Sequence, residues 1–67
     1  MLRDSQSFLL EHKDLFSVHF TKAEMDSKTS RDEVFKLFNS TGQVVGRAAF
    51  QYDEAGHLLS LKVQDKE

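Results

Sequence analysis

A short motif occurs twice in this chain of 67 residues, and it constrains the fold more than any other feature of the sequence. Residues 38–45 and residues 52–59 share one order of residue types: an aromatic residue, Asn or Asp, two variable residues, a glycine, a polar residue and two aliphatic residues. An Asn or Asp side chain accepts hydrogen bonds from backbone N–H groups two residues further on, which opens a turn. The glycine supplies the positive φ that closes a hairpin loop with a bulge. The sequence therefore predicts two consecutive β-hairpins.

The two hairpins predict an antiparallel meander of three strands, at about residues 33–39, 43–52 and 57–64. In the last strand, Leu59, Leu61 and Val63 alternate with polar residues, so one face of this strand is expected to lie against a core. In the middle strand, Gly46 interrupts the alternation and indicates a bulge, which would turn Val45 inward. Most of the predicted sheet is thus defined by turn chemistry and alternation.

The region before the hairpins is less uniquely defined by its pattern. Candidate N-cap residues precede Phe8, which favours a short helix at about residues 4–13. Strict alternation of apolar and polar residues predicts a strand at about residues 15–21. The polar residues 22–32 fit either a loop or a short helical turn. Residues 31–39 also have an alternative, because their capping-box spacing and apolar stripe fit a helix as well as a strand.

Together these elements predict an α+β fold, in which a short N-terminal helix packs on a three- to four-stranded antiparallel β-meander. Residues 1–67 are expected to form a single small domain. The chain contains no cysteine, so no disulfide compensates for the small core that this length allows. Small domains without such a staple depend on tight packing or on association with another chain. The short length is therefore an argument for a partner.

The charge pattern argues against several classes of partner. Nine basic and eleven acidic residues give a net charge of −2, and no segment concentrates lysine and arginine. We therefore expect no electrostatically driven binding to nucleic acid or to a membrane surface. No apolar stretch has the length of a signal peptide or of a membrane-spanning helix, so the expected location is the cytoplasm.

The sequence shows no pattern that is typical of catalysis or metal binding. The histidines do not share the short spacing of a metal site, and cysteine ligands are absent; these histidines are His12, His19 and His57. The adjacent carboxylates of Asp53 and Glu54 fall in a predicted turn, where water solvates both. A glycine-flanked nucleophile or a phosphate loop is also absent. We expect no enzyme, and no catalytic, cofactor-binding or metal-binding residues.

The predicted sheet carries more apolar side chains than one core requires. A short helix covers one face of a sheet, and several apolar residues are expected on the opposite face. A contiguous exposed apolar patch on a small chain marks an interaction site. We therefore expect a protein-binding surface made of Val34, Phe38, Arg47, Ala49 and Leu58. Alternatively, the remaining segments cover both faces, or the strand parity is shifted by one residue.

These expectations lead to a hypothesis about function. The chain is expected to be a small non-enzymatic protein-interaction module, such as an inhibitor, adaptor or accessory subunit. Its expected partner is a second copy of itself, bound through a sheet face or edge, or another protein. One alternative is a binder of single-stranded nucleic acid that uses the face of Phe35–Phe38. The other alternative is a structural domain of a larger chain.

Overall fold

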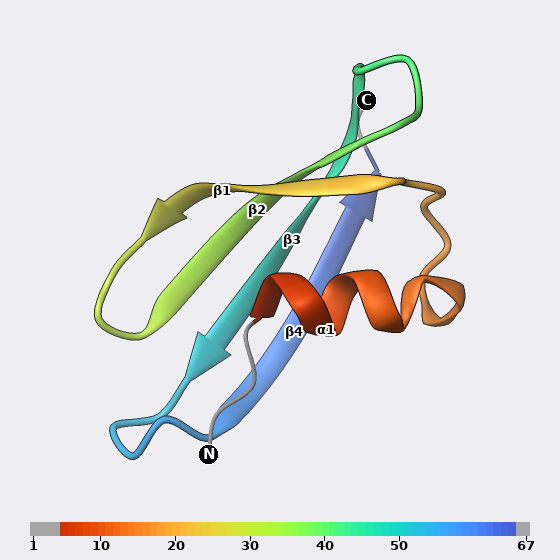
Figure 1. The fold of residues 1–67 in the computed structure, drawn as a ribbon. Helices are drawn as coiled ribbons and strands as arrows, with labels where there is room; N and C mark the ends of the chain where they lie inside the picture. The colour runs from red at the N-terminus through yellow and green to blue at the C-terminus, as the bar shows by residue number, and fades with distance from the viewer. Residues whose placement is uncertain (1–4, 66–67) are drawn as a thin grey trace.

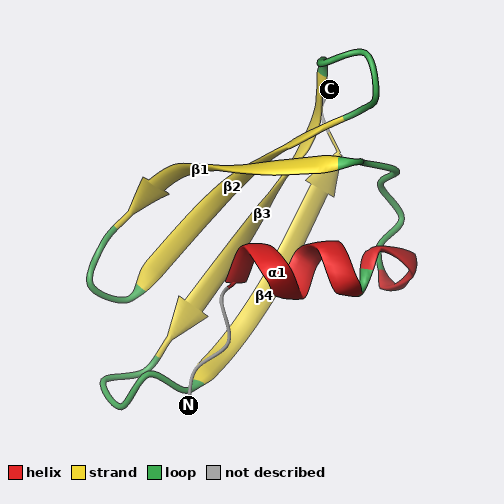
Figure 2. Cartoon of the chain, viewed as in Figure 1, coloured by secondary structure: helices red, strands yellow, loops and turns green. Residues whose placement is uncertain are grey.

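The computed structural model describes residues 5–65, which form a short helix and a four-stranded antiparallel sheet (Figure 1, Figure 2). The elements are the helix α1 (Ser5–Glu11), the 3-10 turn η1 (Lys13–Leu15) and the strands β1 (Lys22–Lys28), β2 (Asp32–Phe38), β3 (Val44–Tyr52) and β4 (Leu58–Asp65). The strands lie side by side in sequence order, so each strand pairs with its neighbour along the chain. The predicted α+β class is confirmed, and the predicted helix start at residue 4 lies outside the described residues.

The turn chemistry expected from the repeated motif is confirmed. In the first hairpin, the Asn39 side-chain oxygen accepts hydrogen bonds from the backbone N–H groups of Thr41 and Gln43, each at 3.0 Å. Gly42 and Gly56 have φ angles of +89° and +88°, a region that residues with a Cβ rarely adopt. Local bonds thus define both loops, and the loops set the register of the strands that they join.

The second hairpin turn makes the same bonds with a carboxylate. Asp53 Oδ1 accepts hydrogen bonds from the backbone N–H of Ala55 at 2.9 Å and from that of His57 at 2.8 Å. The bond from the His57 backbone holds the pKa of Asp53 below its ordinary value of 3.8, and the His57 side chain adds to this effect. The ionised form is therefore favoured by folding, and the turn contributes stability above the unfolded-state pKa of about 3.9.

This contribution is lost as the pH falls through the lower, folded-state pKa of Asp53. We expect Asp53→Asn to weaken the acid-induced loss of stability, because asparagine makes the same turn bonds at position 39 without titrating. Urea unfolding at several pH values between about 2 and 6 measures the effect. Glu54→Gln, which removes a neighbouring carboxylate, is the control and should retain the steeper pH dependence of the parent chain. Equal slopes in the parent chain and Asp53→Asn would contradict this account.

Strand β1 is formed by a segment whose sequence pattern is not that of a strand. The prediction of a strand at about residues 15–21 was wrong, and the polar residues 22–28 form a strand instead of a loop or helical turn. Of the seven residues of β1, only Ala23 is buried. Although α1 packs against it, this edge strand needs few apolar side chains, because its backbone pairing with β2 holds it in the sheet. Alternation therefore gives no signal here.

The segment between η1 and β1 covers the core without joining the sheet. Val18 and Phe20 are buried and Phe16 is half-buried against the core, whereas Ser17 and His19 are exposed. The alternation in this segment therefore predicted correctly which side chains are buried. It failed to distinguish an extended covering segment from a strand, because both place successive side chains on opposite sides.

The core lies between one face of the sheet and the layer formed by α1 and the segment that follows it (Figure 1). Phe50 lies at its centre, with its ring centroid 6.2 Å from that of Phe8 and 5.8 Å from that of Phe35, both in edge-to-face geometry. The buried hydrophobic residues are Leu9, Val18, Phe20, Ala23, Phe35, Leu37, Ala48 and Phe50. Every strand except β4 supplies at least one of them.

The bulge predicted near Gly46 is present in β3. Leu37 lies opposite Gly46 and Phe38 lies opposite Val44, which leaves Val45 without a partner in β2. Val45 packs against the core, as expected. A Cβ at the glycine would collide with a backbone carbonyl of β4, so this position requires the close approach that glycine allows.

Candidate functional site

The two faces of the sheet differ in what covers them. Along β3, Ala48 and Phe50 are buried, whereas Arg47, Ala49 and Gln51 point to the opposite side and are exposed. Figure 1 shows α1 lying on one side of the twisted sheet. We call the other side the open face. Its residues, assigned by cross-strand pairing and, for Asp26, by its ion pairs, are Lys22, Glu24, Asp26, Ser27, Asp32, Val34, Lys36, Phe38, Val44, Arg47, Ala49, Gln51, Ser60, Lys62 and Gln64.

Apolar side chains lie in two places on the open face. Val34 is half-buried and lies opposite the exposed Ala49, and Phe38 lies opposite Val44, both half-buried. A shallow hollow of about 260 Å³ is lined by Asp32, Val34, Ala49, Phe50, Gln51, Ser60 and Lys62. Val34 is half-buried and Ala49 has no side-chain torsion to restrict, so both lose little entropy when a partner covers them, and this is the part of the face best suited to apolar contact.

One carboxylate holds two basic side chains at the centre of the open face. The register of β1 skips between Met25 and Ser27, which places Asp26 in a bulge. Its carboxylate oxygens lie 3.7 Å from Lys36 Nζ and 3.7 Å from Arg47 Nε. Exposed ion pairs of this length contribute little to stability. Because two cations share one carboxylate, the centre of the face keeps an excess of positive charge.

The open face has a positive net charge, whereas the chain as a whole has a negative one. The ammonium group of Lys22 lies 5.9 Å from the ring centroid of Phe38 and 2.7 Å from the Glu24 carboxylate. Four basic residues and three acidic residues lie on this face, namely Lys22, Lys36, Arg47 and Lys62, and Glu24, Asp26 and Asp32. Its balance is therefore +1 in a chain of net charge −2, so the remaining residues together carry −3.

Four of the five residues predicted to bind a partner come together on the open face: Val34, Phe38, Arg47 and Ala49. Leu58 does not, and the prediction that it shares this face was wrong. The register of β3 and β4 skips one residue, so Gln51 lies opposite Ser60 while Tyr52 lies opposite Leu58. Leu58 thus points to the same side as Tyr52, which packs against the core. Leu59, expected inward, has no partner in β3 and is 63% exposed.

A second apolar surface, not expected from the sequence, lies at the corner where β4 begins. Leu58 is 45% exposed and adjoins the exposed Leu59. A hollow of about 260 Å³ next to them is lined by Ser5, Phe8, Phe50, Tyr52, Gly56, His57 and Leu58. We call this surface the β4 corner. The sequence feature that could have indicated this surface is the pair of adjacent leucines after the turn glycine Gly56. Simple alternation assigns the two leucines to opposite faces, because alternation takes no account of a bulge.

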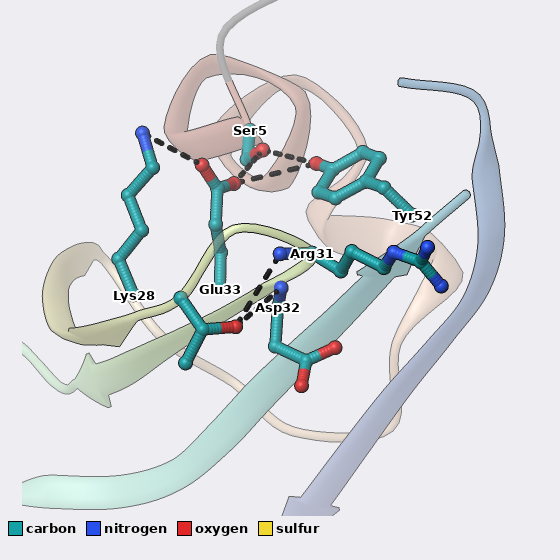
Figure 3. Close-up of polar contacts among 7 residues, drawn as sticks. Ser5, Lys28, Arg31, Asp32, Glu33 and Tyr52 are labelled. Atoms are coloured by element: carbon teal, nitrogen blue, oxygen red, sulfur yellow. Dashed lines mark hydrogen bonds and ion pairs between the residues drawn. The ribbon is translucent and has the colours of Figure 1, made fainter. Parts of the chain in front are cut away.

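A cluster of polar side chains joins α1 to three strands beside the β4 corner (Figure 3). The Ser5 hydroxyl donates a hydrogen bond to Glu33 Oε1 at 2.5 Å and lies 2.5 Å from the Tyr52 hydroxyl. Tyr52 also lies 3.3 Å from the same carboxylate oxygen, and Lys28 Nζ lies 3.5 Å from the other. Ser5 and Glu33 are 28 positions apart in sequence, so no local pattern could predict this contact. Its members satisfy one another, and the cluster anchors the helix.

The residues considered for catalysis or metal binding are dispersed over the surface. His19 and His57 are exposed, and the His57 ring lies 3.3 Å from the Asp53 carboxylate within one hairpin turn. His12 stacks on Phe8, with ring centroids 4.4 Å apart. Within residues 5–65, no group of three or more His, Cys, Asp or Glu side chains is arranged to hold a metal ion.

The aromatic residues considered for stacking on nucleic acid lie on different sides of the sheet. Phe35 is 2% exposed and belongs to the core, whereas Phe38 lies on the open face. Stacking of successive bases needs aromatic rings on one accessible surface. Phe35 and Phe38 therefore do not form the binding face that this alternative assumed.

Comparison with known proteins finds no match to this chain among family models, curated proteins or solved structures. In the part of the chain that the structure describes, no helix has the length and apolar character needed to cross a membrane. The function is therefore inferred from the geometry and charge of the two surfaces described above.

Proposed function

We propose that this chain is a small, non-enzymatic protein-interaction module that binds a partner protein through the open face. The observation that carries the proposal is the alternation of burial along β3, where Ala48 and Phe50 are buried while Arg47 and Ala49 are exposed. A four-stranded sheet with one uncovered, partly apolar face has a surface ready for a second layer. A partner that supplies this layer would make the chain an inhibitor, adaptor or accessory subunit.

The charge of the open face supports a partner with an apolar surface that also carries carboxylates. Lys36 and Arg47 share the single carboxylate of Asp26, and the face has a net charge of +1. Complementary charge across an interface directs association and excludes wrong partners. The apolar contacts at Val34 and Ala49 would supply burial, and Arg47, a residue type enriched in interface hot spots, would pair with an acidic group of the partner.

We expect Arg47→Glu to lower the affinity for this partner by at least about tenfold, because the variant reverses the charge at the centre of the face and places it beside Asp26. Arg31→Glu is the matched control. Arg31 is an exposed arginine outside the open face, paired with Glu54 at 2.8 Å. The partner is captured from a lysate of the source cells with the immobilised parent chain, purified, and titrated against each variant by isothermal titration calorimetry.

The salt dependence of the same titration tests the proposed chemistry of the partner. Raising the ionic strength from about 0.05 M to 0.5 M should weaken binding of the parent chain, because salt screens exposed charges. The Arg47→Glu variant should show a smaller change. Equal losses of affinity in Arg47→Glu and Arg31→Glu would contradict the assignment of the open face. Capture of single-stranded nucleic acid instead of protein would contradict the proposal and favour a nucleic-acid-binding function.

A further inference from the structure

The two edges of the sheet differ in how well they are protected against pairing with another strand. Strand β1 has lysines at both ends, Lys22 and Lys28, and a bulge at Asp26. Charged ends and bulges are features by which edge strands avoid pairing. Strand β4 has a charged residue at one end only, Asp65, and a single lysine inside it, Lys62, and its bulge lies at its start. The rest of β4 is therefore the regular, less protected edge.

The hydrogen bonds of β3 show which backbone groups β4 presents at this edge. The Tyr52 N–H donates to the Arg31 carbonyl on the β2 side, and the Asp53 N–H donates to the His57 carbonyl on the β4 side. Bonds alternate sides along an antiparallel strand, so the β3 residues at odd positions bond to β4. Their partners in β4 are Ser60, Lys62 and Gln64. The N–H and C=O groups of the intervening β4 residues therefore point outward, away from β3.

We propose that a second copy of this chain pairs antiparallel with β4, with Leu61 opposite the partner's Leu61. A two-fold axis perpendicular to the sheet keeps equivalent faces together, which allows pairing centred on residue 60, 61 or 62. Centring on residue 62 would place Lys62 directly opposite itself, and like charges opposite each other destabilise a pair. Centring on residue 60 would carry the pairing across the bulge at Leu59, so that only Ser60 and its own copy would pair within the regular part of the strand.

Centring on residue 61 gives complementary pairs on both sides of the edge. On the covered side, Leu61 meets its own copy, and the half-buried Val63 of each chain lies beside the exposed Leu59, which occupies the bulge of the other chain. On the open side, Ser60 meets Lys62 without a clash of charge. The pairing forms an eight-stranded sheet with both α1 helices on one side and both open faces on the other. It deepens the proposed function, because it would present two open faces as one surface.

The test is the dissociation constant of the dimer in two variants of opposite charge at one position. Ser60→Lys places a lysine opposite the partner's Lys62 at two symmetric positions, and Ser60→Glu places a glutamate there. We expect the first to weaken the dimer by about three- to tenfold and the second to strengthen it by a similar factor. Sedimentation equilibrium over a dilution series should give the parent chain a mass of about 15 kDa, twice its 7.7 kDa, at high concentration.

Two further variants show whether the edge itself is used. Val63→Pro removes an outward N–H without removing a bond to β3, so the variant should stay folded by circular dichroism and sediment as a monomer. Gln51→Lys adds the same charge as Ser60→Lys on the same face but one strand further in, and should leave the dimer unchanged. A parent chain that is monomeric at about 1 mM would overturn the proposal. So would a dimer that is insensitive to residue 60 and is broken by Ala49→Lys, because that result would place the contact on the open face.

These outcomes remain separate from those of the proposed function. Val63→Pro leaves every residue of the open face in place, so this monomeric variant should still bind the captured partner protein through its open face. A dimer that forms as described while Arg47→Glu has no effect on partner binding would contradict the proposed function alone.

Discussion

Phe50→Ala is expected to leave much of the protein unfolded. The Phe50 side chain is 2% exposed, and its ring packs near those of Phe8, Phe35 and Tyr52. Truncation of a buried phenylalanine costs about 3–5 kcal/mol, through lost burial and the cavity that remains. A chain of this length has a total free energy of unfolding of about 3–10 kcal/mol. Urea unfolding followed by circular dichroism measures the loss.

Phe38→Ala is the matched control, because it makes the same substitution on the opposite face of the sheet. Phe38 is half-buried, with Lys22 above its ring and no core residue opposite it in the register of β2 and β3. We expect a loss of about 1 kcal/mol in the free energy of unfolding, since only part of the side chain is removed from water. If both substitutions cost the same, the open face would be a second core and not a docking surface.

Leu9→Ala is expected to produce the other large loss of stability, about 2–5 kcal/mol, because Leu9 is fully buried and belongs to the core. A helix of seven residues is too short to be stable alone, so its attachment to the sheet decides whether it forms. Leu10→Ala is the control, since Leu10 is adjacent in the same helix but 37% exposed, and it should cost less than about 1 kcal/mol. Equal losses would mean that α1 does not pack as described.

The parts of the fold that follow from local chemistry were predictable from the sequence. Asn39 and Asp53 bond to the backbone of their own turns, and the two turn glycines take the positive φ that their position requires. These turns specify the β2–β3 and β3–β4 hairpins without reference to the rest of the chain. Strand β1 could not be predicted in this way. Its loop to β2 is also closed locally, since the Thr29 hydroxyl accepts a hydrogen bond from the Asp32 N–H at 3.0 Å, but residues 29–31 include no Asn, Asp or glycine that would indicate a turn. The side chains of β1 are almost all exposed, so alternation gives no signal either.

The sequence predicts the candidate site only as well as it predicts which face of the sheet each strand residue points to. Val34 and Phe38 were expected on the face opposite the core, and the structure places both on the open face, together with Lys36. Leu58 was misplaced because the bulge at Leu59 is a property of strand pairing and not of the local sequence. The hydrogen bonds of Ser5 to Glu33 and Tyr52 could not be predicted from the sequence either, since they join residues far apart in the chain.

Two neighbouring alanines give the most direct measurement of the central claim that the open face binds the partner. Ala49 lies on the open face, whereas Ala48 is fully buried in the core on the other side of the same strand. Methyl-labelled protein is titrated with the captured partner and followed by two-dimensional NMR. We predict that the methyl signals of Ala49 and Val34 shift or broaden while those of Ala48 and Leu9 do not. Changes at the methyl groups of Leu58 and Leu59, with Ala49 and Val34 unaffected, would contradict the account.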